Sequence, residues 1–124
     1  MHKVLIVDDE PLIRWAVREV LEGAGYATLE AGTAREALSY LQDGQRDAFA
    51  VALLDLRLPD SDDLSLLCRI RDLAPHCQVI MMTAHGTSEL MTQAIQAGAF
   101  STISKPFDLV RLVGLVQAAE AVAS

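Results

Sequence analysis

The stretch Val4-Leu5-Ile6-Val7-Asp8-Asp9-Glu10 decides the fold, because an apolar run of strand length ends directly in three acids. Four more apolar runs, each bounded by Gly, Pro, Asp or Ser, lie at residues 26–29, 49–54, 79–82 and 100–103. The segments between the runs repeat apolar residues at i, i+3 and i+4, a spacing typical of amphipathic helices. Five buried strands that alternate with helices predict an α/β fold, in which a doubly wound parallel sheet is covered on both faces.

The expected helices carry signals at their ends. They lie over residues 12–21, 34–41, 64–73, 89–97 and 109–122. Thr33, with Glu36 three residues later, predicts an N-terminal cap, and Asp108 predicts another. Gly98 is expected to end the fourth helix, because glycine adopts a left-handed conformation at little cost. Together these elements predict one domain, 1–124.

Composition excludes several classes of protein. The chain of 124 residues has the length of one domain, and its formal net charge of −7 opposes binding of nucleic acid through a broad basic surface. No apolar stretch approaches the roughly 20 residues that span a bilayer. Cys68 and Cys77 lack the paired spacing of a metal site or a disulfide framework, so we expect a reduced, cytoplasmic protein.

Acidic side chains end two of the predicted strands. Asp8, Asp9 and Glu10 follow the first strand, and Asp55 follows the third, so this topology brings them to the same edge of the sheet. An acid at a strand end is by itself common as a turn former, but several carboxylates in one cleft are costly unless a cation shares the site. Oxygen ligands suit Mg²⁺, and zinc is disfavoured because no His or Cys lies near these strand ends in the sequence.

A hydroxyl and an ammonium are expected at the same edge. Thr83 ends the fourth strand, and Lys105 follows the fifth. Taken singly, Thr83 is an ordinary strand-end hydroxyl and Lys105 a solvated surface charge. If the Asp55 carboxylate attacked a phosphorus atom, however, the incoming oxygens would need a metal, a hydrogen-bond donor and a second positive charge. The sequence supplies all three.

These motifs resemble, in order and spacing, the receiver domain of two-component response regulators. They are Val7-Asp8-Asp9-Glu10, Leu54-Asp55-Leu56-Arg57-Leu58-Pro59, Met82-Thr83-Ala84, and Gly98-Ala99-Phe100 through Lys105-Pro106-Phe107. The resemblance covers essentially the whole chain and implies a flavodoxin-like (βα)5 sheet with strand order 2-1-3-4-5. It also implies a cis peptide bond before Pro106. The segments around Thr83 and Lys105 are most similar to receivers that control sigma-54-dependent transcription activators.

The resemblance implies a role for each matching residue. Asp55 would be the phosphorylated residue, Thr83 would bond the phosphoryl group in the activated state, and Lys105 would pair with it. The implied ligands of Mg²⁺ are Asp8, Asp9, Asp55 and the backbone carbonyl of Arg57. The implied protein is a signalling switch rather than a metabolic enzyme. A sensor histidine kinase would donate the phosphoryl group, and the Ala-rich residues 117–124 would begin a linker helix towards an output domain that controls transcription.

Two positions depart from the family pattern. Receivers usually have an aromatic residue three positions before the lysine, where this chain has Thr102. Phe100 is expected to point to the same face as Thr102, since residues two apart in a strand share a face, and could substitute for the aromatic residue. Asp63 replaces a common glycine, which favours capping of the third helix over a glycine-only turn. Arg57 and His85 flank the site and are expected either to modulate loss of phosphate or to be merely solvated.

The last expected helix has more apolar residues than one face can bury. They are Leu109, Val110, Leu112, Val113, Leu115, Val116, Ala118, Ala119 and Val122. Such an excess predicts a partner surface, and Gly114 would allow close approach of another backbone. We therefore expect a homodimer, or docking of an effector, through the fourth helix, the fifth strand and the fifth helix. Shielding by a neighbouring domain is the alternative.

Three other functions compete with this interpretation. A phosphohydrolase of the haloacid dehalogenase type needs a second acid two residues after its aspartate nucleophile, where this chain has Arg57. A flavodoxin-like flavin carrier needs a phosphate loop rich in Ser, Thr and Gly after the first strand, where this chain has acids. A degenerate receiver that acts by protein binding alone remains open, because Thr102 and Asp63 depart from the pattern.

Overall fold

The computed structural model describes residues 3–42, 48–84 and 87–123, in which strands and helices alternate as expected. The elements are β1 (Lys3–Val7), α1 (Pro11–Gly23), β2 (Ala27–Ala31), α2 (Ala34–Gln42), β3 (Phe49–Asp55), α3 (Ser65–Leu73), β4 (Gln78–Thr83), α4 (Ser88–Gln96), β5 (Ser101–Ser104) and α5 (Leu109–Ala123). No helix in these ranges has both the length and the apolar character needed to cross a bilayer.

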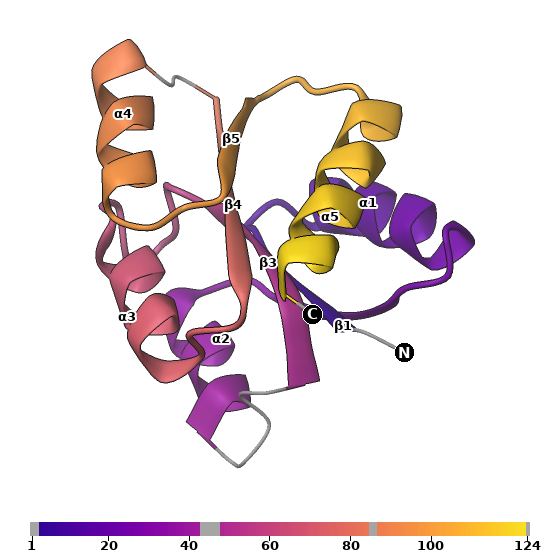
Figure 1. Cartoon of the computed structure of the whole chain (residues 1–124), viewed down its shortest axis with the longest axis horizontal. Helices are drawn as coiled ribbons and strands as arrows, with labels where there is room; N and C mark the ends of the chain where they lie inside the picture. Colours follow the sequence, from indigo (N-terminus) through magenta and orange to yellow (C-terminus); the bar gives the residue numbers. More distant parts are fainter. Residues whose placement is uncertain (1–2, 43–47, 85–86, 124) are drawn as a thin grey trace.

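The strands form one parallel sheet in the order β2-β1-β3-β4-β5, which confirms the expected topology. Helices α2, α3 and α4 cover one face, and α1 and α5 cover the other (Figure 1). The order reverses between β1 and β3, where Val7 lies opposite Leu54. The residues after β1 and at the end of β3 are therefore neighbours at the carboxyl edge of the sheet, which is where doubly wound folds bind ligands.

The sheet separates two apolar clusters. The cluster under α2, α3 and α4 includes Leu5 and Leu54, and the cluster under α1 and α5 includes Ile6 and Leu53. This alternation along β1 and β3 follows from the two-residue period of a strand. A strand with helices over both of its faces is almost wholly apolar. Polar residues can therefore stand only at the ends of the central strands β1, β3 and β4, at the edge of the sheet.

The expectation of five buried strands is wrong for the two edges of the sheet. In β1, β3 and β4 almost every residue is buried, whereas only Ala31 in β2 and Ile103 in β5 are buried. An edge strand has a neighbour on one side only, and the flanking helices cover it incompletely. β2 also begins one residue later and ends two residues later than expected, because Glu30 and Ala31 continue its pairing with β1.

The sequence signals for helix ends are largely confirmed. The Thr33 hydroxyl accepts the Glu36 N–H at 3.1 Å, although the Glu36 carboxylate reaches the N–H of Gly32 at 2.7 Å rather than that of Thr33. The Asp108 carboxylate accepts the N–H of Val110 at 2.8 Å. Gly98 follows α4 with φ of 108°, the left-handed conformation expected of it. The Lys105–Pro106 bond is cis, as the resemblance implied.

Candidate functional site

Four strands deliver polar residues to the carboxyl edge of the sheet. Asp8 follows β1 and is fully buried, Asp55 ends β3 and is 8% exposed, and Thr83 ends β4 and is also buried. Lys105 follows β5, where its N–H donates to the Thr83 carbonyl at 2.7 Å. The expected gathering of these four residues from distant parts of the chain is therefore observed.

Lys105 joins the buried acids. Its Nζ lies 2.7 Å from Asp8 Oδ2, 3.2 Å from Asp55 Oδ2 and 3.6 Å from Glu10 Oε1, and its side chain is only 8% exposed. Because Asp8 and Asp55 are separated from Lys105 by 97 and 50 residues, these ion pairs tie the ends of three strands together. The ammonium is a charge that offsets part of the repulsion among the acids.

Burial and the neighbouring charges shift the pKa values of Asp55 and Lys105. Burial raises the pKa of the Asp55 carboxyl, and the Asp8 charge adds to this, so that it lies above its ordinary value even though the Arg57 N–H and Lys105 act in the opposite direction. Burial lowers the pKa of Lys105, but the hydrogen bonds and charges of Asp8 and Asp55 outweigh it, so the pKa lies above its ordinary value. The resting site therefore holds a charged ammonium beside a carboxylate that gains from a further cation.

The acids form a cluster suited to a metal ion. Asp8, Asp9, Glu10 and Asp55 each place one carboxylate oxygen within 4.8 Å of the others. A hollow of about 270 Å³ opens beside them, lined by Asp9, Glu10, Asp55, Arg57, Thr83, Ala84 and Lys105. The donor set contains oxygen only, which fits a hard cation and does not fit zinc. Glu10, which the sequence analysis places at this edge but which is absent from the ligand set that the resemblance implies, belongs to this cluster.

The structure describes Arg57 and Asp63, two of the residues that the sequence analysis singled out beside the acidic cluster. Arg57 is exposed and lines the hollow, and its N–H donates to Asp55 Oδ1 at 3.2 Å. His85 lies outside the described residues. Asp63 accepts hydrogen bonds from the N–H and the hydroxyl of Ser65 at the start of α3. Among the described residues only Gly25 and Gly98 have positive φ, so the turn at Asp63 needs no glycine.

The expectation that Phe100 shares a face with Thr102 is wrong. Thr102 lines an apolar gap of about 10 Å³ under α4, together with Met81, whereas Phe100 packs against the cluster under α1 and α5. The two-residue period holds only inside a regular strand, and β5 begins at Ser101, one residue after Phe100. Phe100 therefore does not occupy the space that Thr102 leaves beneath α4.

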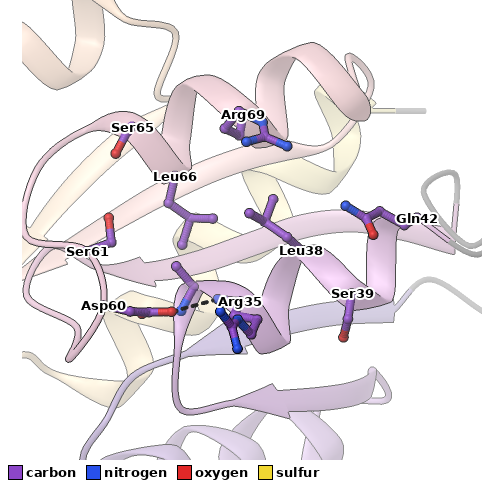
Figure 2. Close-up of a pocket in the computed structure, with 10 residues that line it drawn as sticks. Arg35, Leu38, Ser39, Gln42, Asp60, Ser61, Ser65, Leu66 and Arg69 are labelled. Carbon is purple, nitrogen blue, oxygen red and sulfur yellow. Dashed lines mark hydrogen bonds between the residues drawn. The ribbon is translucent and has the colours of Figure 1, made fainter.

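A second hollow lies on a different part of the molecule, between α2 and α3. It has a volume of about 420 Å³ and is lined by residues that include Arg35, Leu38 and Arg69 (Figure 2). At its rim the two carboxylate oxygens of Asp60 accept the N–H groups of Ala34 and Arg35, at 2.8 and 3.0 Å. The loop after Asp55 is thus fastened to the first turn of α2, a contact that local sequence patterns did not indicate.

Comparison with known proteins identifies the family. Residues 4–117 match the family described as response regulator receiver domain. The chain is 39% identical over 116 residues to the DNA-binding transcriptional regulator NtrC of Salmonella typhimurium, and 41% identical over 118 residues to the response regulator protein PilR of Pseudomonas aeruginosa. The solution structure of the beryllofluoride-activated NtrC4 receiver domain dimer matches with a TM-score of 0.89 and 33% identity, covering 100% of both chains. The chain therefore belongs to the response regulator receiver domain family.

The two curated relatives are much longer than this chain. The alignments cover 94% and 95% of this chain but 24% and 26% of NtrC and PilR, respectively. The chain thus spans about a quarter of their length.

Proposed function

We propose that this protein is a phosphorylation-controlled switch, in which Asp55 accepts a phosphoryl group from a sensor histidine kinase and the modified protein controls transcription through an output domain. The observation that carries the proposal is the position of the Asp55 carboxylate, 3.2 Å from the Lys105 ammonium and within 4.8 Å of three further acids. A nucleophile, a cation and a set of metal ligands at one hollow are what transfer to a carboxylate requires.

The proposed transfer is a simple displacement. A carboxylate oxygen of Asp55 forms a bond to phosphorus while the bond from phosphorus to the donor imidazole breaks, and the electron pair stays with that nitrogen, which takes up a proton. The Lys105 ammonium would then balance charge on the phosphoryl group, and the Thr83 hydroxyl would donate a hydrogen bond to it. The reaction leaves a modified Asp55 and a free donor, so we class the protein as a switch whose chemistry is limited to making and hydrolysing its own aspartyl phosphate.

Mg²⁺ is the metal we propose for the acidic cluster. Its ligands would be Asp8, Asp9, Asp55 and the backbone carbonyl of Arg57, with Glu10 at the edge of the cluster. The ion would neutralise the phosphoryl oxygens during transfer. Arg57 and His85 would modulate the lifetime of the phosphoryl group.

The transfer is tested with a small phosphoryl donor, which removes the need for the kinase. With Mg²⁺ and acetyl phosphate, the wild type should gain the mass of one phosphoryl group and Asp55→Asn should gain none. Asp62→Asn, which removes an exposed acid of the same loop, is the matched control and should behave like the wild type. Modification of Asp55→Asn to the wild-type extent would refute the assignment. A wild type that neither gains mass nor responds to beryllofluoride with Mg²⁺ would favour the degenerate receiver.

We also propose that activation promotes a homodimer through α4, β5 and α5. This face carries Ile95, which is 48% exposed, and a hollow of about 390 Å³ whose lining includes Met91, Thr102 and Arg111. The dimer named in the NtrC4 structure is a precedent in a similar chain. Part of the excess apolar surface of α5 lies elsewhere, since Val110 lines a hollow on the α1 side.

The position of the interface is tested by placing one charge in α4, on the proposed face, and another in α5, on the α1 side. Ile95→Arg should abolish dimer formation with beryllofluoride and Mg²⁺ in sedimentation experiments, whereas Val110→Arg should leave it intact. The reverse result would move the interface to the α1 side.

The remaining part of the proposal concerns what lies outside the domain. α5 is continuous to Ala123, and we propose that residues 117–124 lead into a linker and an output domain of the sigma-54-dependent activator type that the sequence resembles. The length of the relatives NtrC and PilR supports this arrangement. A cytoplasmic location is proposed because Cys68 and Cys77 are both free thiols.

A further inference from the structure

We propose that Arg14 is a positioning residue for the metal-binding acids, because it holds the peptide unit between Asp8 and Asp9. This inference rests on the proposed function, since it concerns how the acidic cluster presents its ligands to Mg²⁺. Arg14 lies in the first turns of α1, and its side chain is 20% exposed. It belongs to none of the motifs that carry the family resemblance.

The contacts of Arg14 connect the acidic edge to β2. Its Nη1 donates to the backbone carbonyl oxygen of Asp8 at 2.5 Å, and its Nε donates to Glu30 Oε1 at 3.3 Å. The other oxygen of the Glu30 carboxylate accepts from Arg18 Nη1 at 2.9 Å. The carboxylate of Glu30 is thus held between two guanidinium groups, and it fixes the plane of the Arg14 group that reaches Asp8.

The carbonyl of Asp8 matters because a peptide unit is planar. Its direction fixes the position of the N–H and Cα of Asp9, and therefore the origin of the Asp9 side chain. The N–H of Asp8 is already fixed by the Ala31 carbonyl at 3.0 Å, and Asp8 Oδ1 accepts the N–H of Glu10 at 2.9 Å. The Arg14 contact holds the remaining polar group of the Asp8 backbone, so two consecutive acids depend on it.

Gly32 provides an independent observation. A Cβ built on Gly32 would lie 3.3 Å from Arg14 Nη1, closer than most such contacts, although Gly32 has no positive φ to explain the absence of a side chain. The glycine leaves space for the guanidinium group beside the end of β2. Arginine suits this position because its rigid planar group donates in two directions at once, to Asp8 and to Glu30, which lysine cannot do with one nitrogen.

The affinity for Mg²⁺, measured by calorimetry, tests the role of Arg14. Arg14→Gln should weaken Mg²⁺ binding by about ten- to a hundredfold, as is usual when a group that orients a metal ligand is lost. Loss of a positive charge near the site would by itself strengthen cation binding, so the expected sign is opposite to a simple charge effect. Arg14→Lys should fall between the wild type and Arg14→Gln.

Arg18→Gln is the matched control, because it removes the same charge and a bond to the same Glu30 without touching Asp8. It should bind Mg²⁺ as tightly as the wild type or slightly more tightly. In the metal-free proteins the carbonyl carbon resonance of Asp8 should shift in Arg14→Gln and not in Arg18→Gln. This measurement reports the hydrogen bond itself rather than the stability of the fold.

The outcomes separate the inference from the proposed function. Wild-type affinity in Arg14→Gln, or an equal loss in Arg18→Gln, would overturn the role of Arg14 and leave the switch intact. Failure of the wild type to bind Mg²⁺ would overturn the proposed function. If circular dichroism shows that Arg14→Gln is unfolded, the test is made with Arg14→Lys instead. A wild-type affinity of Arg14→Lys for Mg²⁺, together with an unshifted Asp8 carbonyl resonance, would refute the proposal.

Discussion

Replacing Lys105 with methionine should destabilise the metal-free protein strongly and the Mg²⁺-bound protein much less. The ammonium lies 2.7 Å from Asp8 Oδ2 and 3.2 Å from Asp55 Oδ2, and both acids are buried. Methionine keeps most of the apolar stem but removes the charge. Two carboxylates then face each other without a cation, so the free energy of unfolding falls.

The magnitude follows from these distances. At an effective dielectric constant of about 20, each contact contributes on the order of 5 kcal/mol of attraction before desolvation is counted. Removing one partner of a buried ion pair typically costs about 3 kcal/mol or more, because the desolvated charge of the other partner is left uncompensated. For a domain of this size, such a loss lowers Tm by about 10 °C.

Mg²⁺ should reverse much of this loss. At about a hundred times its Kd, a ligand that binds only the native state adds about 2.7 kcal/mol to the free energy of unfolding. The ion should bind Lys105→Met more tightly than the wild type, since no ammonium competes for the acids. In excess Mg²⁺ the difference in stability between the two proteins narrows by RT times the logarithm of the ratio of their Kd values, so binding about tenfold tighter to Lys105→Met would recover about 1.4 kcal/mol, roughly half of the loss.

Urea unfolding with and without Mg²⁺ measures both gaps. Lys3→Met, which removes the only other lysine of the sequence at an exposed position in β1, is the matched control and should change stability little in either condition. A metal-free Lys105→Met that is as stable as the wild type would refute the reasoning. An equal loss with and without Mg²⁺ would show that the ammonium does not share the role of the metal.

Three further perturbations have defined outcomes. Because the pKa of Asp55 is raised in the folded protein, its ionised form destabilises the native state. In metal-free urea unfolding at pH 7, Asp55→Asn should therefore be more stable than the wild type. This gain in stability should vanish below the ordinary carboxyl pKa of about 4, where the wild-type carboxyl is protonated in both the folded and the unfolded state. Asp60→Ala should lower the free energy of unfolding by about 1 kcal/mol, because it removes the acceptor of the first N–H groups of α2. The same hydrogen bonds hold the pKa of Asp60 below its ordinary value. The difference in stability should therefore disappear when acid protonates the wild-type carboxylate. Gly98→Ala should lower the free energy of unfolding by about 1–2 kcal/mol because of its positive φ, whereas Gly23→Ala, at the end of α1 with open space around it, should not lower it; thermal unfolding of the two variants checks this contrast.

The sequence was sufficient to predict the sheet and the edge that carries the site. Apolar runs that end in Asp8 and in Asp55 define both the strands and the side to which their polar ends project, because parallel strands place all carboxyl ends together. Thr83 and Lys105 followed from the same rule. Every strand has an end that differs from the expected one, by one residue in β1, β3, β4 and β5 and by up to two residues in β2. The apolar pattern is weaker in an edge strand such as β2, because the helices cover it incompletely.

The sequence did not indicate how the side chains pair at that edge. Lys105 was expected to meet a phosphoryl group, but its contacts at rest are with Asp8 and Asp55, and such pairings depend on side-chain torsions rather than on spacing. The contact of Asp60 with α2 likewise joins segments that are 26 residues apart. Phe100 was misplaced because the alternation rule was applied one residue outside the strand.

Lys105 pairs with Asp8 and Asp55 in the unmodified protein, and in the proposed mechanism it pairs with the phosphoryl group instead. β5 has four residues and, among the described strands, pairs with β4 alone, so the ion pairs of Lys105 with the ends of β1 and β3 are a second anchor for this edge strand. A phosphoryl group that draws the ammonium to itself would loosen that anchor. β5, and the helices α4 and α5 beside it (Figure 1), would then be the first elements to gain conformational freedom. The loss of one ion pair at the phosphorylation site would thus be converted into movement at the edge of the sheet.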